Sequence, residues 1–456
     1  MQNEIRTQVL RAWSSRTPVA GAVKSRLPGG VASCVSAWVA CLCVVPPLAI
    51  AQSPYKVAWT TDIGAASVAT TVAVDADGNI LVSGGTLGNL AGQNAGGTDA
   101  FVAKYDPQGQ LVWARQFGNV GEDRGRSVAV DVDGSVYVTG PTRGATGGTE
   151  VLLRKFDSSG DDVWMHQFGD LDQVAVIGTG VSVLSSGDVI MAGHTYGRLL
   201  HPIGLGSDPV LYKYTSSGEN LWATQNNNNS RFYFQEVTSH AVDQQGNSYL
   251  AGLGTSGDLW YWPAHRSWVE KYDAAGQLLW SRTPDPSGAV HHNNAMAVGV
   301  DGEGNVYVAG TNEVGGGNPP VPLSSYNAYL VKYSPDGDLL WNQQFDSPSS
   351  FNNLAIDPAG NVYVGLGGIL QSVNAGGVIP PLARAIVKYD ASGTPLWTMD
   401  VGVNFHAMIY SEGSLYLAGS SVTKLVPVPE LPAWSMTLAV ALALPWAERM
   451  GRRVRR

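Results

Sequence analysis

One ten-residue phrase recurs six times in this 456-residue chain, and it constrains the fold more than any other feature. The phrase has the form Lys-aromatic-x-x-x-Gly-x-x-x-Trp and occupies 104–113, 155–164, 213–222, 271–280, 332–341 and 388–397. A second phrase alternates with it, as in AVDADGNILVSG (73–84) and GVDGEGNVYVAG (299–310). Such periodic self-similarity indicates a repeat architecture. The repeated residues are therefore expected to build the fold, and function is expected from residues that do not repeat.

Each repeat predicts two β-hairpins. Alternating apolar residues flank an Asp/Gly turn in SVAVDVDGSVYVTG (127–140), and a second pair of strands flanks Ser158-Ser159-Gly160. We name the four strands of a unit a, b, c and d. The a–b turn opens with Asp75, Asp131, Asp243, Asp301 or Asp357. These turns are too short for a calcium loop of the EF-hand type, so we predict a turn role for their aspartates.

Counting the phrases predicts the number of units. The a–b hairpin appears seven times, at 72–84, 128–140, 181–193, 240–252, 298–310, 354–365 and 408–419. The d-strand tryptophan appears six times, and the seventh, Trp59, precedes the first a strand. Trp59 thus supplies the outer strand that the last segment, 421–425, lacks. We predict an all-β fold, a seven-bladed β-propeller of four-stranded blades that the N-terminal strand closes. A linear solenoid would need polar capping repeats, which the sequence does not show.

The d-strand tryptophans are predicted to pack between neighbouring blades and to have a structural role. They are Trp59, Trp113, Trp164, Trp222, Trp280, Trp341 and Trp397.

The phrases resemble the SBBP repeats of seven-bladed bacterial propellers. The shared run is hydrophobic-Asp-x-x-Gly-Asn-x-Tyr-Val-x-Gly, as in 300–310, and the resemblance covers about 57–425. KYDxxGxxxW is also similar to the tryptophan-docking motif of quinoprotein propellers. The resemblance implies a propeller and, for function, only a surface protein.

The two ends are predicted to be sorting signals. Residues 1–51 read as a secretion signal with a basic start, an apolar run and an Ala-Ile-Ala cleavage site; a retained membrane anchor is the alternative. All three cysteines lie there, so we expect no disulfide in the mature chain. Residues 427–456 resemble a PEP-CTERM signal, although Pro-Glu-Leu-Pro replaces Pro-Glu-Pro. That resemblance implies a Gram-negative source, export to the cell surface, processing by an exosortase-type protease and transient membrane contact. The alternative is a plain anchor.

The central part, 52–426, is strongly acidic. The two ends carry ten of the 28 Lys/Arg and three of the 37 Asp/Glu, which leaves 18 basic and 34 acidic residues and a net charge of −16. Such a domain repels phosphate backbones, so nucleic acid is an unexpected partner.

Length variation is confined to the b–c and d–a loops, which should share one face of the propeller. The loop 258–268 is rich in aromatic residues, and a sugar-binding platform or a local cap would explain them. Its candidate binding residues are Trp260, Tyr261, Trp262, His265 and Trp268.

Residues before the a strands should surround the mouth of the central channel. Among these, the candidates for binding are Arg124, Glu236, His291, His292 and His406. Neighbouring strand residues point to opposite faces, so His291 and His292 form a poor chelate, and we predict no metal site and no cofactor.

The sequence therefore predicts an exported, non-enzymatic scaffold that binds an extracellular polysaccharide or surface protein through its loop face. The alternative is a propeller enzyme, either a quinoprotein dehydrogenase or a polysaccharide lyase or hydrolase. A hydrolase would need two carboxylates at the mouth, for which Asp123 and Glu236 are available.

Overall fold

The computed structural model describes residues 54–143, 147–169, 175–196, 206–226, 234–256, 264–284, 293–313, 326–348, 350–367 and 383–429. All regular secondary structure in these ranges is β-strand. Within the same ranges, no helix is long and apolar enough to span a membrane.

Three sheets have four antiparallel strands each. The first contains β2 (Ser67–Val74), β3 (Ile80–Thr86), β4 (Asp99–Tyr105) and β5 (Leu111–Phe117). The second contains β6 (Ser127–Val130), β7 (Val136–Arg143), β8 (Thr149–Phe156) and β9 (Asp162–Phe168). The third contains β18 (Asn293–Val300), β19 (Val306–Glu313), β20 (Tyr326–Tyr333) and β21 (Leu339–Pro348).

The remaining strands form two larger sheets, each of which joins two such units. One contains β10 (Ala175–Val183), β11 (Val189–Tyr196), β12 (Ser207–Tyr214), β13 (Asn220–Gln225), β14 (Phe234–Val242), β15 (Ser248–Ser256), β16 (Ala264–Tyr272) and β17 (Leu278–Arg282). A single bridge between Ser207 and Phe234 joins its halves. The other contains β22 (Ser350–Ile356), β23 (Val362–Gly367), β24 (Ala383–Tyr389), β25 (Pro395–Ser411), β26 (Ser414–Gly419), β27 (Ser421–Pro427) and β1 (Tyr55–Asp62).

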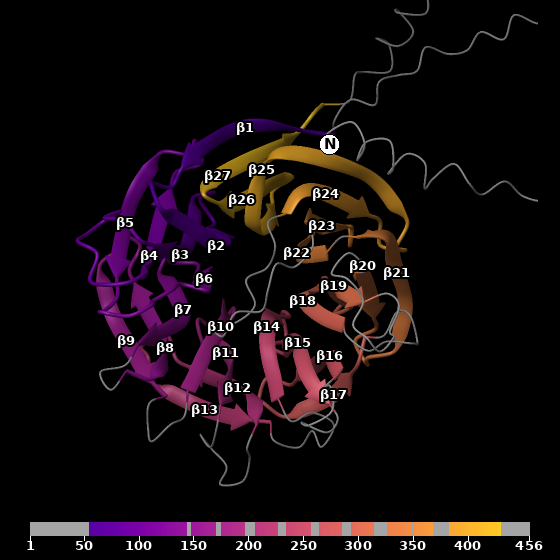
Figure 1. Ribbon diagram of the computed structural model, residues 1–456, viewed down its shortest axis with the longest axis horizontal. Helices are drawn as coiled ribbons and strands as arrows, with labels where there is room; N and C mark the ends of the chain where they lie inside the picture. Colours follow the sequence, from indigo (N-terminus) through magenta and orange to yellow (C-terminus); the bar gives the residue numbers. More distant parts are fainter. Residues whose placement is uncertain are drawn as a thin grey trace, which may run out of the picture. The chain divides into compact units, whose positions relative to one another are not determined.

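The units follow one another around a common centre in chain order (Figure 1). Their first strands are innermost, and each contacts the next: β2 with β6, β6 with β10, β10 with β14, β14 with β18, β18 with β22, β22 with β25, and β25 with β2. The seven predicted a–b hairpins are all present as pairs of antiparallel strands.

The a–b and c–d turns lie at the same end of each sheet, as the sequence predicts. Asp301 Oδ1 accepts the backbone N–H groups of Glu303 and Asn305, at 3.0 and 2.9 Å, and Gly304 has a φ of +81°. A Cβ on Gly304 would lie 3.5 Å from Pro335 of the c–d turn. Asp301 Oδ2 accepts Tyr307 OH at 3.1 Å and pairs with Lys332 Nζ at 3.6 Å. Both carboxylate oxygens of this aspartate are thus bound by residues of its own repeat.

The last glycine of the b strand is required by a β-bulge in the innermost strand. Ala295 pairs with Gly310 and Ala297 with Ala309, so Met296 is an extra residue. A Cβ on Gly310 would lie 2.0 Å from the carbonyl oxygen of Asn294, so only glycine fits there. The same irregularity leaves extra residues in five other innermost strands, namely Thr70, Thr179, Thr238, Asn352 with Asn353, and His406.

The repeated tryptophans pack between units, as predicted. Each of six rings covers the c–d turn glycine of the following unit, where a Cβ would lie 2.7–3.1 Å from the ring. The pairs are Trp59 with Gly109, Trp113 with Gly160, Trp164 with Gly218, Trp222 with Gly276, Trp280 with Gly337, and Trp341 with Gly393. Five of these indoles donate to a backbone carbonyl of the same turn, at 3.0 or 3.1 Å. Trp397 has no such turn ahead of it and packs against Tyr55, with ring centroids 5.9 Å apart.

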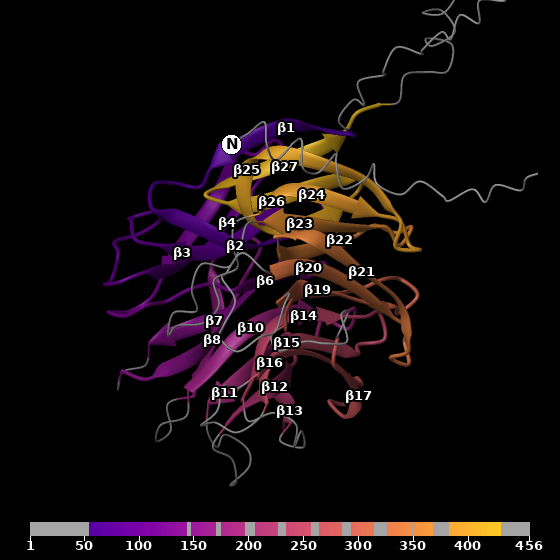
Figure 2. The same cartoon turned by 45° about the vertical axis from the view of Figure 1, so that its right-hand side comes forward.

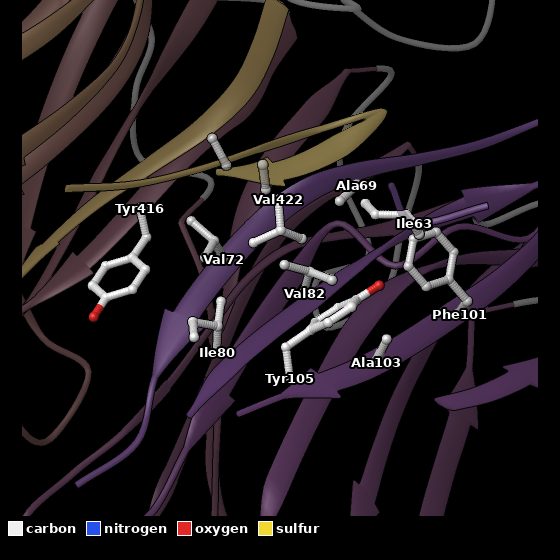
Figure 3. Close-up of a cluster of buried hydrophobic side chains, with 12 residues drawn as sticks. Ile63, Ala69, Val72, Ile80, Val82, Phe101, Ala103, Tyr105, Tyr416 and Val422 are labelled. Carbon is white, nitrogen blue, oxygen red and sulfur yellow. The ribbon is translucent and has the colours of Figure 1, made fainter. Parts of the chain in front are cut away.

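The first and last segments of the described chain pair with each other. β1 is antiparallel to β27, with Thr60 opposite Thr423 and Trp59 opposite Lys424, and the two strands lie side by side in both views (Figures 1 and 2). One core cluster joins Val72, Val82 and Phe101 of the first sheet to Tyr416 and Val422 of the last (Figure 3). The predicted pairing of the Trp59 segment with 421–425 is therefore present.

Two details differ from the sequence prediction. β25 continues from Trp397 to Ser411 as one strand, where separate d and a strands were expected. β16 begins at Ala264, so the second half of the predicted loop 258–268 is strand. In β25, apolar Met399, Val401 and Val403 alternate with exposed residues, so the strand pattern continues across the expected d–a connection. In β16, strand pairing extends along the segment Ala-His-Arg-Ser-Trp, which shows no regular hydrophobic alternation.

Candidate functional site

Five polar residues gather where three units end near the centre. We refer to Arg124, Arg126, His194, Tyr196 and Glu236 as the mouth cluster. The arginines lie just before β6, His194 and Tyr196 are at the end of β11, and Glu236 is at the start of β14. These are the strand ends opposite the tight turns. β6 and β14 are innermost strands, and β11 is the second strand of its unit (Figure 1).

The b-strand glycines place two of these residues at equivalent positions. A Cβ on Gly140 would lie 1.8 Å from the carbonyl oxygen of Arg124, and one on Gly252 would lie 1.9 Å from that of Glu236. Arg126 occupies the position that the bulge residue Thr70 holds in the first unit. A bulge re-aims a side chain out of the regular pleat, which is why bulges are common beside functional sites.

Direct contacts join His194, Tyr196 and Glu236 within the cluster, and Arg126 acts on them as a neighbouring charge. Tyr196 OH donates a hydrogen bond to Glu236 Oε1, and Val237 N donates to His194 Nδ1 at 3.2 Å. The rings of His194 and Tyr196 meet edge to face at 5.4 Å. Arg124 is exposed and pairs with Glu122 at 3.2 Å, an interaction that solvent weakens.

Burial and neighbouring charges set the protonation of the cluster. Burial and, secondarily, the Arg126 guanidinium lower the pKa of His194 to about 3, so the imidazole is neutral. Burial and Arg124 also lower the pKa of Arg126, while Glu236 and Tyr196 act in the opposite direction. Burial and Glu236 raise the pKa of Tyr196, which therefore remains a hydrogen-bond donor.

His406 lies elsewhere, in the bulge of β25, between β22 and β2. It is half-buried, its Nδ1 has no hydrogen-bond partner, and burial lowers its pKa. Asp123, considered above as one of two catalytic carboxylates, is 1% exposed and accepts hydrogen bonds from Thr142 and from the Asn119 backbone.

The aromatic loop is only partly described. Trp260, Tyr261, Trp262, His291 and His292 lie outside the described residues. His265 is half-buried in β16, opposite Thr255. Trp268 is 0% exposed in the core formed with Leu250 and Tyr272, so its assignment to a surface platform was wrong. Strand alternation turns it inward, which the sequence could not indicate while its segment was read as loop.

In the described part of the chain, no three His, Cys, Asp or Glu side chains are arranged to hold a metal ion. A cavity of about 340 Å³ lies between β17 and the next c–d turn, away from the mouth cluster, with Arg282, Tyr333 and Gly337 in its wall. Arg282 already donates to the Gly337 carbonyl at 2.7 Å, which identifies this cavity as part of the packing between units.

Sequence reasoning missed His194 and Tyr196. The available signal was that His194 directly follows the b-strand Gly193, at the end where the variable loops begin. Without the neighbouring units in place, nothing in the sequence links these residues to Arg126 and Glu236.

Comparison with known proteins supports the fold. Residues 112–145 match the family model of the SBBP β-propeller repeat, a segment that runs from β5 of one sheet through the β6–β7 hairpin of the next. A curated relative is the regulatory protein FlaEY of Caulobacter vibrioides, 29% identical over 149 residues, which are 29% of this chain. The match spans 15% of the length of FlaEY.

Among solved structures, the chain is similar to the Pan2 WD40 domain of Neurospora crassa, at 12% identity and a TM-score of 0.48, covering 80% of this chain and 91% of that domain. BamB of Moraxella catarrhalis is also similar, at 12% identity and a TM-score of 0.43, covering 82% of this chain and 99% of BamB.

Proposed function

We propose that the chain is a closed seven-bladed propeller that acts as a binding scaffold, with its partner bound at the face that carries the mouth cluster. Closure is supported by the circular series of contacts among the seven innermost strands and by the β1–β27 pairing. Blades joined in this way form a rigid disc, and loops on a rigid scaffold are where binding residues concentrate.

The observation that carries the binding role is that the polar groups at one end of the sheets follow the repeat, whereas those at the other end do not. At the turn end, repeated carboxylates and indoles are bound by their own or neighbouring units. At the other end, exposed Arg124 and half-buried Glu236 and His406 do not repeat and surround the centre. Non-repeated polar groups at equivalent ring positions are suited to recognising one partner by hydrogen bonds.

We also propose that the protein is exported to the cell surface of a Gram-negative bacterium. This rests on the leader at 1–51 and the signal-like tail at 427–456. Mass spectrometry of the protein from its native cell would test it, because export predicts a mature N-terminus near Gln52 and exosortase processing predicts loss of the arginine-rich end. Recovery of the intact chain would contradict the proposal.

The partner is an extracellular polysaccharide or a surface protein. The test is retention of the purified chain on a glycan array and on a panel of surface proteins from the same cell. We expect Arg124→Ala with Glu236→Gln to weaken retention about tenfold or more, since central polar anchors often contribute more than 1 kcal/mol. Arg115→Ala is the matched control, because Arg115 is partly exposed and bonds Ser159 at the turn end.

Equal loss in both variants, or none in either, would contradict binding at this face. Trp260→Ala with Trp262→Ala tests the aromatic loop separately. Point substitutions are preferred to deletion of the loop 258–268, because the second half of that segment belongs to strand β16. If the protein chemically converted a sugar that it retains, the scaffold hypothesis would be wrong and the enzyme alternative would be supported.

A further inference from the structure

Two buried carboxylates meet where the first two long loops come together. Asp99 begins β4, Asp123 lies in the loop between β5 and β6, and each residue is 1% exposed. The loops are joined by Gly97 N–H to the Gly121 carbonyl at 3.1 Å and by Asp123 N–H to the Thr98 carbonyl at 2.6 Å. The position of the two side chains is therefore set by backbone pairing.

Three of the four carboxylate oxygens have hydrogen-bond donors. Asp99 Oδ2 accepts Gln116 Nε2 at 2.8 Å and Ala95 N at 3.0 Å. Asp123 Oδ1 accepts the Thr142 hydroxyl and Arg143 N, and its Oδ2 accepts Asn119 N at 2.9 Å. Asp99 Oδ1 is buried and has no donor.

The unbound oxygen faces the other carboxylate. Asp99 Oδ1 and Asp123 Oδ2 each lie 2.9 Å from the position that a Cβ on Gly118 would take, so they are at most twice that distance apart. Among the described residues, no Lys or Arg forms an ion pair with either aspartate. Two like charges facing each other away from water repel, and a buried oxygen without a donor is destabilising.

We infer that Asp99 and Asp123 hold one Ca²⁺ ion between these loops. Ca²⁺ binds carboxylate oxygens, accepts backbone carbonyls and water as further ligands, and tolerates irregular geometry. A site with only two carboxylates belongs to the weak, millimolar class that extracellular modules use. This inference is independent of the proposed partner binding.

The repeats show which part of this arrangement is structural. Gln167 bonds Glu150 at 2.6 Å and Gln225 bonds Asp208 at 2.8 Å, in the same way that Gln116 bonds Asp99. The acid–glutamine pair is thus a feature of the first three units, whereas Asp123 comes from a loop that varies. The repeated acid–glutamine pair explains the hydrogen bond to Asp99 Oδ2. It supplies no donor to Asp99 Oδ1, which remains available to a ligand.

The test is calorimetric melting of the full chain after chelator treatment, with and without millimolar CaCl₂ and with NaCl at matched ionic strength. At about 10 mM CaCl₂, roughly ten times a millimolar Kd, we expect Ca²⁺ to raise the Tm of the wild type by about 2 °C. Asp99→Asn should lose this rise and, without metal, should melt no lower than the wild type, because its amide can donate to Asp123. Titration calorimetry should give one Ca²⁺ per chain, absent in Asp99→Asn.

Asp161→Asn is the control for the loss of one negative charge, since Asp161 is an exposed surface residue, and it should keep the full Ca²⁺ response. The same rise in Asp99→Asn as in the wild type would overturn the site. The site would also be overturned if Ca²⁺ left the Tm of the wild type unchanged and Asp99→Asn had a higher Tm than the wild type. That result would mean that the two carboxylates share a proton.

Discussion

At the scale of single residues, the glycines of the c–d turns have two separate roles. Gly393 has a φ of +84°, which a residue with a Cβ adopts only with strain, and its missing Cβ leaves room for the Trp341 ring. Gly413, in the a–b turn between β25 and β26, has a similar φ of +79° but nothing within 4 Å of a Cβ. Substitution of Gly413 therefore tests backbone strain alone, whereas substitution of Gly393 tests backbone strain together with the packing of tryptophan between units.

We predict that Gly393→Ala destabilises the protein by about 2–4 kcal/mol, from backbone strain together with displacement of Trp341. Gly413→Ala carries the strain alone and should cost about 1 kcal/mol. Urea unfolding measures both. Equal losses in the two variants would show that the tryptophan contact contributes nothing.

Another residue-scale prediction concerns acid stability. In the folded protein His194 has a pKa of about 3, below the ordinary value near 6.5. Its contribution to the free energy of unfolding is therefore complete above pH 6.5 and is lost as the pH falls toward 3. The free energy of unfolding should decrease by about 1.4 kcal/mol per pH unit for this histidine.

His194→Asn keeps an acceptor near the Val237 N–H and removes the titrating group. We expect its urea midpoint to fall less steeply than that of the wild type between pH 6.5 and 4.5. Parallel profiles for the two proteins would contradict the assignment.

At the scale of elements, the β-bulge and the b-strand glycine form one unit of structure. Gly310 lies against the Asn294 carbonyl, and the bulge at Met296 allows β18 to pass over it. The bulge residues also link the innermost strands: Thr238 Oγ1 donates to the Ala295 carbonyl at 2.7 Å, and Asn353 Nδ2 to that of His406 at 3.1 Å. The inner wall of the ring therefore depends on the irregular positions.

We predict that Gly310→Ala destabilises the protein by about 3 kcal/mol or more, because its Cβ would meet backbone that cannot move without opening the sheet. Gly302 lies in the neighbouring turn, and a Cβ there would have nothing within 4 Å. Gly302→Ala should therefore change the free energy of unfolding by about 0.5 kcal/mol or less. Thermal unfolding of both variants checks this, and a mild effect of Gly310→Ala would contradict the bulge argument.

At the scale of the whole molecule, stability depends on the junction of β1 with β27. Thr60 and Thr423 face each other with their hydroxyl oxygens 3.1 Å apart, although they are 363 positions apart in sequence. In a closed ring this junction holds every other contact between units in place.

Thr60→Cys with Thr423→Cys, in a chain whose three native cysteines are Ser, should form a disulfide. A crosslink that closes so long a loop is expected to stabilise the fold by about 3–5 kcal/mol. The melting temperatures of the oxidised and reduced protein measure the effect. Failure of the pair to crosslink, while both single variants fold, would contradict a closed ring.

Apart from the continuous β25 and the start of β16, the sequence by itself determined the strands, their turns and the positions of the tryptophans, because these depend on local alternation, turn residues and a period that repeats. It also led to the pairing of Trp59 with the last segment, since one outer strand was missing at one end and left over at the other. Only the tertiary structure showed that Trp268 is core, that Arg126 and Glu236 belong to one cluster with Tyr196 and His194, and that Asp99 faces Asp123. Such contacts join residues of different strands and units that no local pattern relates, and they exist only once the neighbouring sheets are in place.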